Sequence, residues 1–369
     1  MKKTIALILA AAMLVCCLAG CGANKTEDDT VMTVNGVKVS WDEYMFWIGY
    51  AAMYLNYQYS MYGMEVDWTA DNGGGQTNAQ WCVDYAKETV IQKCLIEAKC
   101  AELGVTLNDD DNAEIQKSID DFKVQSCGEG ATDEQFEAFL KSNQNSSIAV
   151  LRSSQEATTL TNKLFNELYG EDGSKADASE LLAAAEEAGY TKCNHILFLF
   201  NDENNEERSD ADKAAGLAKL EGFKDELYAI ENTDERYARF LELKEENCED
   251  TGTDAYQFGE GVMVEEFYAM SRSLGEYEMD IVESSYGYHL IIGLPLDLDY
   301  SVTSQSSTPV SLRETMLNEQ FSDQLSAWEE EAEVVMAEQF ADFDFSTLFG
   351  ASGFIYQSWA DRTAAKEKK

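Results

Sequence analysis

The sequence predicts an α+β protein in which a small α/β domain, made of a four-stranded sheet with helices, is inserted in a mainly helical module. The first observation is that apolar residues recur at helical spacing over long stretches near both ends of the 369-residue chain. The second is that residues 190–294 alternate strand-like and helical segments in the order β-α-α-β-α-β. In about 105 residues, this order gives helices packed on a small sheet.

The N-terminus, "MKKTIALILAAAMLVCCLAGC", predicts an export signal over residues 1–20. Lys2 and Lys3 give a basic start, and an apolar run from Ile5 to Val15 follows. This run is shorter than an ordinary membrane-spanning helix. We therefore expect a chain that is exported.

The end of this segment, "LAGC", resembles the lipobox of bacterial lipoproteins. That resemblance implies cleavage before Cys21 and attachment of lipid to the Cys21 sulfur. Residues 21–30 would then tether the body to the extracytoplasmic face of the cell membrane. A plain secretory signal is the alternative.

The charge balance narrows the class of partner. The chain has 69 acidic and 27 basic residues, a formal net charge of -42. Nucleic acid is excluded as an expected partner, because phosphate binding needs a basic face. We interpret most of the charges as solvated helix faces, which favour solubility and weak attraction to cationic partners.

Six cysteines follow Cys21, and outside the cytoplasm they could form disulfides. No CxxC pair occurs, so their spacing predicts no metal site. Cys94 and Cys100 lie on a predicted helix, where we expect them to pack as small apolar residues. The six are Cys82, Cys94, Cys100, Cys127, Cys193 and Cys248.

The segment "VNGVKVSWDEY" opens an N-terminal helical module that we place at residues 31–172. Asn35-Gly36 is a strong turn signal between two valines. Ser40 followed by Glu43 has the spacing of a capping box and predicts the start of a helix. A second amphipathic helix is predicted over residues 79–103, ended by Gly104, with Asn108 or Asp109 capping the next.

The pattern changes after "YGEDGSKADAS", a candidate linker, and we place the α/β domain at residues 188–296. "TKCNHILFLF" and "YGYHLIIGL" read as strands, and "AYQFGEG" as a turn with a short strand. Helices are predicted over 209–230 and 233–246 and in "MVEEFYAMSRSL".

Another amphipathic helix is predicted after Pro309, over residues 311–342, with Leu317, Phe321, Leu325 and Trp328 on one face. We expect residues 309–349 to pack on the N-terminal module. Residues 350–369 are expected to form a C-terminal tail, and its basic end, "DRTAAKEKK", is expected to be frayed.

Four blocks of the α/β domain resemble a known family. "NHILFLF", "ENCEDTG", "FGEGVMVEEFYAMSRSLGE" and "YGYHLII" occur in the order found in parvulin-type peptidyl-prolyl isomerases. The flanking "VNGVKVSWDEY" and the late helix resemble the chaperone module of PrsA- and SurA-like foldases, and the lipobox favours the lipoprotein branch. The resemblance implies a parvulin-like domain that catalyses cis–trans isomerisation of X–Pro bonds in exported proteins, without metal or cofactor.

The resemblance implies that Met263 and Phe267 form the proline pocket, with Phe258 nearby. Their i, i+4 spacing places them on one face of a helix. On spacing alone, an ordinary helix core is the simpler interpretation. The family pattern favours the pocket.

Asp250 matches the family's acidic residue near the reacting carbonyl. The alternative interpretation is that Asp250 is an ordinary turn residue in "EDTG". Cys248 lies two residues earlier, and some parvulins use cysteine in this region. We rank Cys248 second.

His195 and His289, the only two histidines of the chain, match the family's histidine pair, and Ser284 fits its Thr or Ser position. They would share a hydrogen-bond network on neighbouring strands. Because both nitrogens of a buried histidine need partners, we expect the pair to rigidify the site and not to transfer protons. Tyr288 should point to the opposite face by strand alternation.

The sequence also departs from the family. The usual "GGDLG" loop after the acidic residue is replaced by the shorter "TGTDAYQFG". No basic cluster follows "HILFLF", which argues against phosphoserine-proline specificity. The alternative function is a holdase chaperone with an inactive parvulin-like domain, which would bind unfolded chains through the aromatic-rich "YMFWIGYAAMYLNYQYSMYGM". A solute-binding lipoprotein would share only the lipobox.

Overall fold

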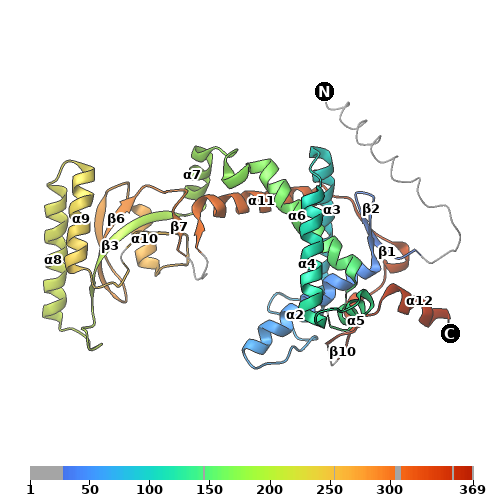
Figure 1. Cartoon of the computed structure of the whole chain (residues 1–369). Coiled ribbons are helices and arrows are strands. Elements are labelled where there is room, and N and C mark those ends of the chain that lie inside the picture. Colours follow the sequence, from blue (N-terminus) through green and yellow to red (C-terminus); the bar gives the residue numbers. More distant parts are fainter. Residues whose placement is uncertain (1–27, 144–145, 253, 304–308, 351–352, 368–369) are drawn as a thin grey trace. The chain divides into compact units, whose positions relative to one another are not determined.

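A computed structural model describes residues 28–143, 146–252, 254–303, 309–350 and 353–367. The predicted signal peptide over residues 1–20, the predicted lipidation site Cys21 and most of the tether lie outside these residues. Helices and small antiparallel sheets make up the chain (Figure 1), which confirms the predicted α+β class.

The chain divides into two compact units. One unit contains Met1–Leu95, Asn108–Glu156 and Ala332–Lys369, and the other contains Ile96–Leu107 and Ala157–Glu331. The second unit therefore holds the whole α/β domain together with the helices on either side of it.

The first unit begins with an antiparallel sheet of order β2-β1-β9, formed by β1 (Thr30–Val34), β2 (Val37–Ser40) and β9 (Val334–Met336). The predicted turn joins β1 to β2, with φ of 49° at Asn35 and 82° at Gly36. Positive φ at both central residues is what a type I′ hairpin turn needs.

The helices of this part begin and end near their sequence signals. Ser40 Oγ accepts a hydrogen bond from the backbone N–H of Glu43, but the Glu43 carboxylate lies 3.0 Å from Lys93 Nζ. The second half of the predicted capping box is therefore replaced by an ion pair. Asn108 caps α4 in a full capping box. The bounds are α2 (Trp41–Met61), α3 (Asn78–Leu103), α4 (Asp109–Cys127), α5 (Asp133–Asn143) and α6 (Ile148–Tyr169).

The C-terminal segment packs on Trp41, the first residue of α2. The Trp41 ring contacts a cluster of aromatic rings, and its indole N–H donates to the Gln357 carbonyl at 2.7 Å. The predicted tail is therefore held against α2 by contacts of Gln357 and Trp359 with Trp41. The ring partners are Phe340, Phe343, Phe345 and Trp359. The elements are η2 (Glu338–Phe340), η3 (Phe345–Leu348), β10 (Phe349–Gly350), β11 (Gly353–Phe354) and α12 (Trp359–Glu367).

The predicted helix after Pro309 is shorter than expected. It is α11 (Leu312–Glu330), and β9 begins four residues later. Leu317 packs with α7 (Ala178–Glu187), and Phe321 packs with Leu164 of α6. Short elements nearby are η1 (Glu171–Gly173), β7 (Ser301–Val302) and β8 (Val310–Ser311).

The α/β domain contains a four-stranded antiparallel sheet of order β4-β3-β6-β5. Its strands are β3 (Thr191–Leu199), β4 (Tyr256–Phe258), β5 (Met279–Glu283) and β6 (Gly287–Leu294). Sequence patterning located three of them and missed β5. The helices are α8 (Asp210–Tyr228), α9 (Thr233–Asn247) and α10 (Glu265–Ser273) (Figure 1).

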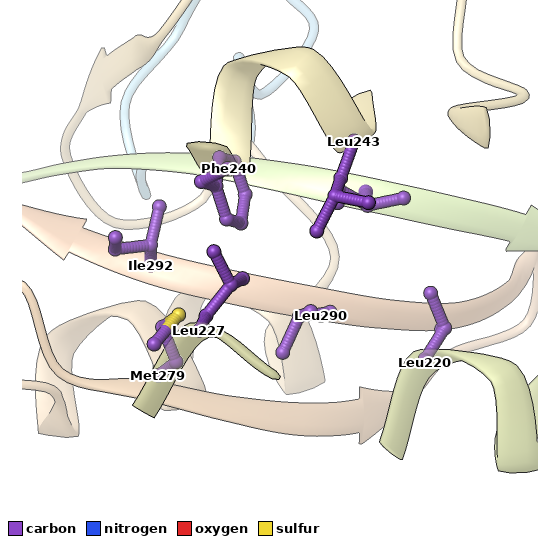
Figure 2. Close-up of a cluster of buried hydrophobic side chains, with 8 residues drawn as sticks. Leu220, Leu227, Phe240, Leu243, Met279, Leu290 and Ile292 are labelled. Atoms are coloured by element: carbon purple, nitrogen blue, oxygen red, sulfur yellow. The ribbon is translucent and has the colours of Figure 1, made fainter. Parts of the chain in front are cut away.

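Strand alternation divides the side chains of β6 between two cores. Leu290 and Ile292 belong to a cluster with α8 and α9, against which Tyr288 also packs. Figure 2 shows Leu220 and Leu227 of α8 and Phe240 and Leu243 of α9 gathered there. Each fully buried leucine of this kind contributes roughly 1.5–3 kcal/mol. Ile291 lies in a separate cluster with Phe267 of α10, so this is the face on which His289 lies.

All six cysteines of the described residues are free thiols. Cys94 and Cys100 are buried as predicted. Within the described ranges, no helix is both long enough and apolar enough to cross a bilayer.

Candidate active site

The two central strands bring the two histidines together. In the β3–β6 ladder, His195 pairs with Ile291 and Leu197 pairs with His289, so the histidines are diagonal neighbours on one face. Each is only 4% exposed. Their Nδ1 atoms lie 3.0 Å apart.

Asp250 follows the C-terminus of α9 and reaches back to the histidines. Its Oδ2 lies 2.9 Å from His195 Nε2 and accepts a hydrogen bond from the Tyr256 hydroxyl at 2.8 Å. Its Oδ1 accepts from the Gly252 N–H at 3.3 Å. The hydrogen bond from His195, followed by those from Tyr256 and Gly252, holds the pKa of Asp250 well below its usual value, against the opposing effect of burial.

Ser284 closes the other end of the network. Its Oγ lies 2.7 Å from His289 Nε2 and accepts a hydrogen bond from the Tyr286 N–H at 3.1 Å. Burial, reinforced by the neighbouring His195, lowers the pKa of His289 to about 4. His289 is therefore neutral at physiological pH.

These contacts fix a single direction of hydrogen bonding when both imidazoles are neutral. An ionised Asp250 only accepts, so His195 donates through Nε2–H and its Nδ1 must accept from His289. His289 then carries its proton on Nδ1 and accepts at Nε2 from the Ser284 hydroxyl. Ser284 in turn accepts from Tyr286. Each polar atom of this buried chain has a partner, so the network is rigid.

A cavity of about 310 Å³ opens over this network. One wall is polar and is formed by the network itself, and the other is apolar. The Phe267 ring lies edge-on to both imidazoles, with centroid distances of 5.1 Å to His195 and 5.2 Å to His289. The lining residues are His195, Asp250, Tyr256, Val262, Met263, Val264, Phe267, Tyr286 and His289.

Three expected pocket residues have different positions. Met263 and Phe267 both line the cavity, but Met263 precedes α10, which begins at Glu265 after Val264 as its N-cap residue. They meet through a turn and not as one helix face. Phe258 is fully buried beneath Phe267, with ring centroids 5.9 Å apart, and does not line the cavity.

Cys248 also lies outside the cavity lining. Its Sγ accepts from the Leu197 N–H at 3.3 Å and lies 3.7 Å from the His195 carbonyl oxygen. The thiol therefore contacts the backbone of β3, whereas Asp250 contacts the imidazole. This placement assigns Cys248 a structural position.

Sequence reasoning missed four residues of the site, namely Tyr256, Val262, Val264 and Tyr286. Tyr256 and Phe258 lie two residues apart on β4, so alternation places both on the face of β3 that carries Cys193. The two-residue spacing between Tyr256 and the predicted pocket residue Phe258 could therefore have identified Tyr256 from the sequence. Tyr286 lies in the turn between β5 and β6, and no sequence pattern indicated that it belongs to the site.

The site has no metal-binding arrangement. Across the described ranges, no three His, Cys, Asp or Glu side chains are grouped so that they could hold a metal ion. The chemistry available from the described side chains is hydrogen bonding, apolar contact and the negative charge of Asp250.

No protein-family model and no curated protein sequence matches this chain. Solved structures of the foldase PrsA are similar to it. A peptidylprolyl isomerase (PrsA) from Bacillus anthracis is 18% identical, covering 66% of this chain and 94% of that chain, with a TM-score of 0.25. PrsA from Bacillus subtilis is 19% identical (72% and 89% covered, TM-score 0.21).

Foldase protein PrsA from Streptococcus pneumoniae is 13% identical and covers 76% of this chain and 89% of that chain, with a TM-score of 0.21. At these identities and TM-scores, the functional argument rests on the geometry of the site itself.

Proposed function

We propose that this protein is a membrane-anchored, extracytoplasmic foldase that catalyses cis–trans isomerisation of X–Pro bonds in exported polypeptides. The observation that supports this most is the cavity, in which an apolar wall containing Met263 and Phe267 faces the hydrogen-bonded network that ends at Asp250. The partners are unfolded or newly exported chains that contain proline.

The apolar wall suits a proline ring and removes water from the adjacent amide. Rotation of an amide has a barrier of about 18–20 kcal/mol, because resonance gives the C–N bond double-bond character. Resonance separates charge, so it is weaker in an apolar environment. Each reduction of about 1.4 kcal/mol in the barrier gives roughly tenfold in rate.

Asp250 adds an electrostatic contribution. Planar amide resonance places negative charge on the carbonyl oxygen, and twisting the bond removes it. An ionised carboxylate beside that oxygen therefore destabilises the planar form relative to the twisted transition state. In this mechanism, His195 and His289 hold Asp250 in place and transfer no proton.

Exchange spectroscopy on an X–Pro peptide tests the activity. The wild type should accelerate exchange above the uncatalysed rate, and Met263→Ala and Phe267→Ala should each lower kcat/KM by tenfold or more. Met53→Ala is the matched control, because Met53 is 48% exposed on α2. No acceleration by the wild type would overturn the enzymatic part of the proposal.

The anchor is tested separately. With lipidation at Cys21, the wild type should sediment with membranes after export, and Cys21→Ala should be released as a soluble protein. Equal partitioning of both would contradict the anchored form while leaving the activity open to its own test.

A second candidate is a holdase without isomerase activity, which the exposed end of α2 favours. Tyr57 is 62% exposed, Met61 67% and Tyr62 79%. Such side chains make adaptable apolar contacts. Suppression of client aggregation without any acceleration of proline exchange would select this function, and replacing Tyr57, Met61 and Tyr62 together by serine should then abolish the suppression.

A further inference from the structure

The candidate cavity contains an acidic side chain to which no lysine or arginine of the described residues donates. Asp250 is hydrogen-bonded to the His195 imidazole, the Tyr256 hydroxyl and the Gly252 backbone N–H. Its side chain is 26% exposed, so part of the charge faces the cavity. Neither lysine nor arginine is among the described lining residues.

Two basic residues close to Asp250 have other hydrogen-bond partners, Arg208 through the neighbouring Glu249 and Lys244 at the end of α9. Arg208 makes two hydrogen bonds to the Glu249 carboxylate, at 3.0 and 2.9 Å. Lys244 is only 6% exposed, and its Nζ donates to Asn194 Oδ1 at 2.6 Å. Asn194 and His195 are consecutive on β3 and therefore point to opposite faces, so this lysine lies behind the strand.

The rim of the cavity adds further acidic groups. Glu260 precedes the lining residue Val262 by two positions, and Glu265 and Glu266 follow Val264 directly. All three glutamates are exposed, and none has an ion pair within the described part of the chain. Glu265 and Glu266 also lie in the first turn of α10, where negative charge is favourable.

We propose that this cavity selects X–Pro segments in which the residue X is cationic, lysine or arginine. The inference rests on the proposed function and names the substrate class of the same site. With the proline ring on the apolar wall and the carbonyl of X beside Asp250, the side chain of X begins next to this carboxylate. Asp250 Oδ1 accepts only from Gly252 among the described residues, so it has capacity for a further donor.

The physical basis is electrostatic. Opposite charges a few ångströms apart attract much more strongly in a partly desolvated site than in water. A cationic X would supply a counter-charge inside the cavity, and a glutamate at X would be repelled by Asp250 and by the rim. The preference should weaken with salt, because the rim charges are exposed and screened.

Three peptides of sequence Ala-X-Pro-Phe, with X as lysine, alanine or glutamate, test the inference with the full-length protein. We expect kcat/KM to be about tenfold higher for lysine than for glutamate at low salt, with alanine between them, and the ratio to fall in 0.5 M NaCl. Equal values for the three peptides, or a preference for glutamate, would overturn the inference.

Binding separates this inference from the proposed function. If no peptide is isomerised, the enzymatic proposal fails, and NMR titration of the same peptides still decides the inference. Tighter binding of the lysine peptide supports it, and equal affinities contradict it.

Charge variants locate the preference. The double variant Glu260→Gln, Glu265→Gln should reduce the lysine-to-glutamate ratio at least twofold while leaving the rate on the alanine peptide unchanged. Glu221→Gln is the matched control, because Glu221 is an exposed residue of α8, which packs on the opposite face of the sheet. An unchanged ratio in the double variant would exclude the rim as a source of selectivity.

Discussion

The Nδ1 atoms of His195 and His289 lie 3.0 Å apart, between side chains on two strands whose backbones pair in one antiparallel ladder. One of these nitrogens must donate and the other must accept. The tautomer of one histidine is therefore set by the other, and both depend on which groups lie at the ends of the chain, Asp250 and Ser284. A substitution at Asp250 or at Ser284 should therefore change the hydrogen bonding of both histidines.

Ser284→Ala removes the donor at one end. His289 Nε2 then has no hydroxyl partner, and an unsatisfied buried acceptor costs about 1–3 kcal/mol. We expect urea denaturation at pH 7 to show a loss of that size in the free energy of unfolding, together with lower kcat/KM on an X–Pro peptide. Ser284→Thr keeps the hydroxyl and should retain most of both quantities.

Ser285→Ala is the control for this change, because Ser285 is exposed and adjacent. It should leave stability and activity within error of the wild type. If Ser284→Ala and Ser285→Ala behave alike, the hydroxyl at 284 does not orient His289.

The lowered pKa of His289 predicts a dependence of stability on pH. Its pKa falls from 6.5 in the unfolded chain to about 4 in the folded protein, chiefly because of burial and then because of the neighbouring His195. The folded state thus favours the neutral ring. Its contribution is complete above pH 6.5 and is lost as the pH falls from 6.5 towards 4, at up to about 1.4 kcal/mol per pH unit and roughly 3 kcal/mol in all.

His289→Gln isolates this contribution, since glutamine does not titrate. Between pH 7 and pH 4, the wild type should lose roughly 3 kcal/mol more of its unfolding free energy than the variant does. Asp250 has a lowered pKa and acts with the same sign, but only below its unfolded value near 3.9. Parallel curves for the two proteins across this window would show that His289 does not remain neutral in the folded state.

The fold was predictable from the sequence wherever a local signal coincides with packing. Asn35-Gly36 and Asn108 specify a turn and a cap through their own backbone preferences, and both occur as expected. The α8 and α9 helices could be located because apolar residues repeat along them. The packing of the C-terminal segment could not be predicted, because it depends on contact between Trp41 and Trp359, which are far apart in the chain.

The residues of the site also differ in whether the sequence could predict them. His195, His289 and Asp250 could be named because each lies in a block of sequence with a recognisable pattern, and Ser284 because it lies just before the last block. The structure places all four in one network. Tyr256 lies in the stretch that departs from the pattern. Its role depends on the distance of its hydroxyl from Asp250, which spacing along the chain does not reveal.

Tyr256→Phe tests how the shortened loop supports the site. The ring stays in place, but Asp250 loses one of its two Oδ2 donors, so its pKa should rise towards the usual value. We expect a several-fold decrease in kcat/KM and a loss of about 1 kcal/mol in unfolding free energy. Tyr286→Phe, in an exposed cavity residue, is the control and should change stability by less than 0.5 kcal/mol.

Two glycines of α8 should respond to the same substitution with opposite signs. At Gly216, an added Cβ would lie 2.5 Å from Cδ1 of the Phe198 ring on β3, so Gly216→Ala forces the helix away from the sheet. Overpacking of this kind costs about 1–3 kcal/mol. At Gly222, nothing lies within 4 Å of the added atom. Gly222→Ala should therefore stabilise the protein by about 0.5–1 kcal/mol through helix propensity.

Chemical denaturation of the two variants checks this prediction directly. Because both changes add the same methyl group to the same helix, differences in unfolded-state entropy largely cancel between them. The comparison therefore measures how closely α8 approaches Phe198. A destabilisation of Gly222→Ala equal to that of Gly216→Ala would contradict the close contact between α8 and β3, and with it the packing that supports His195 from the opposite face of the sheet.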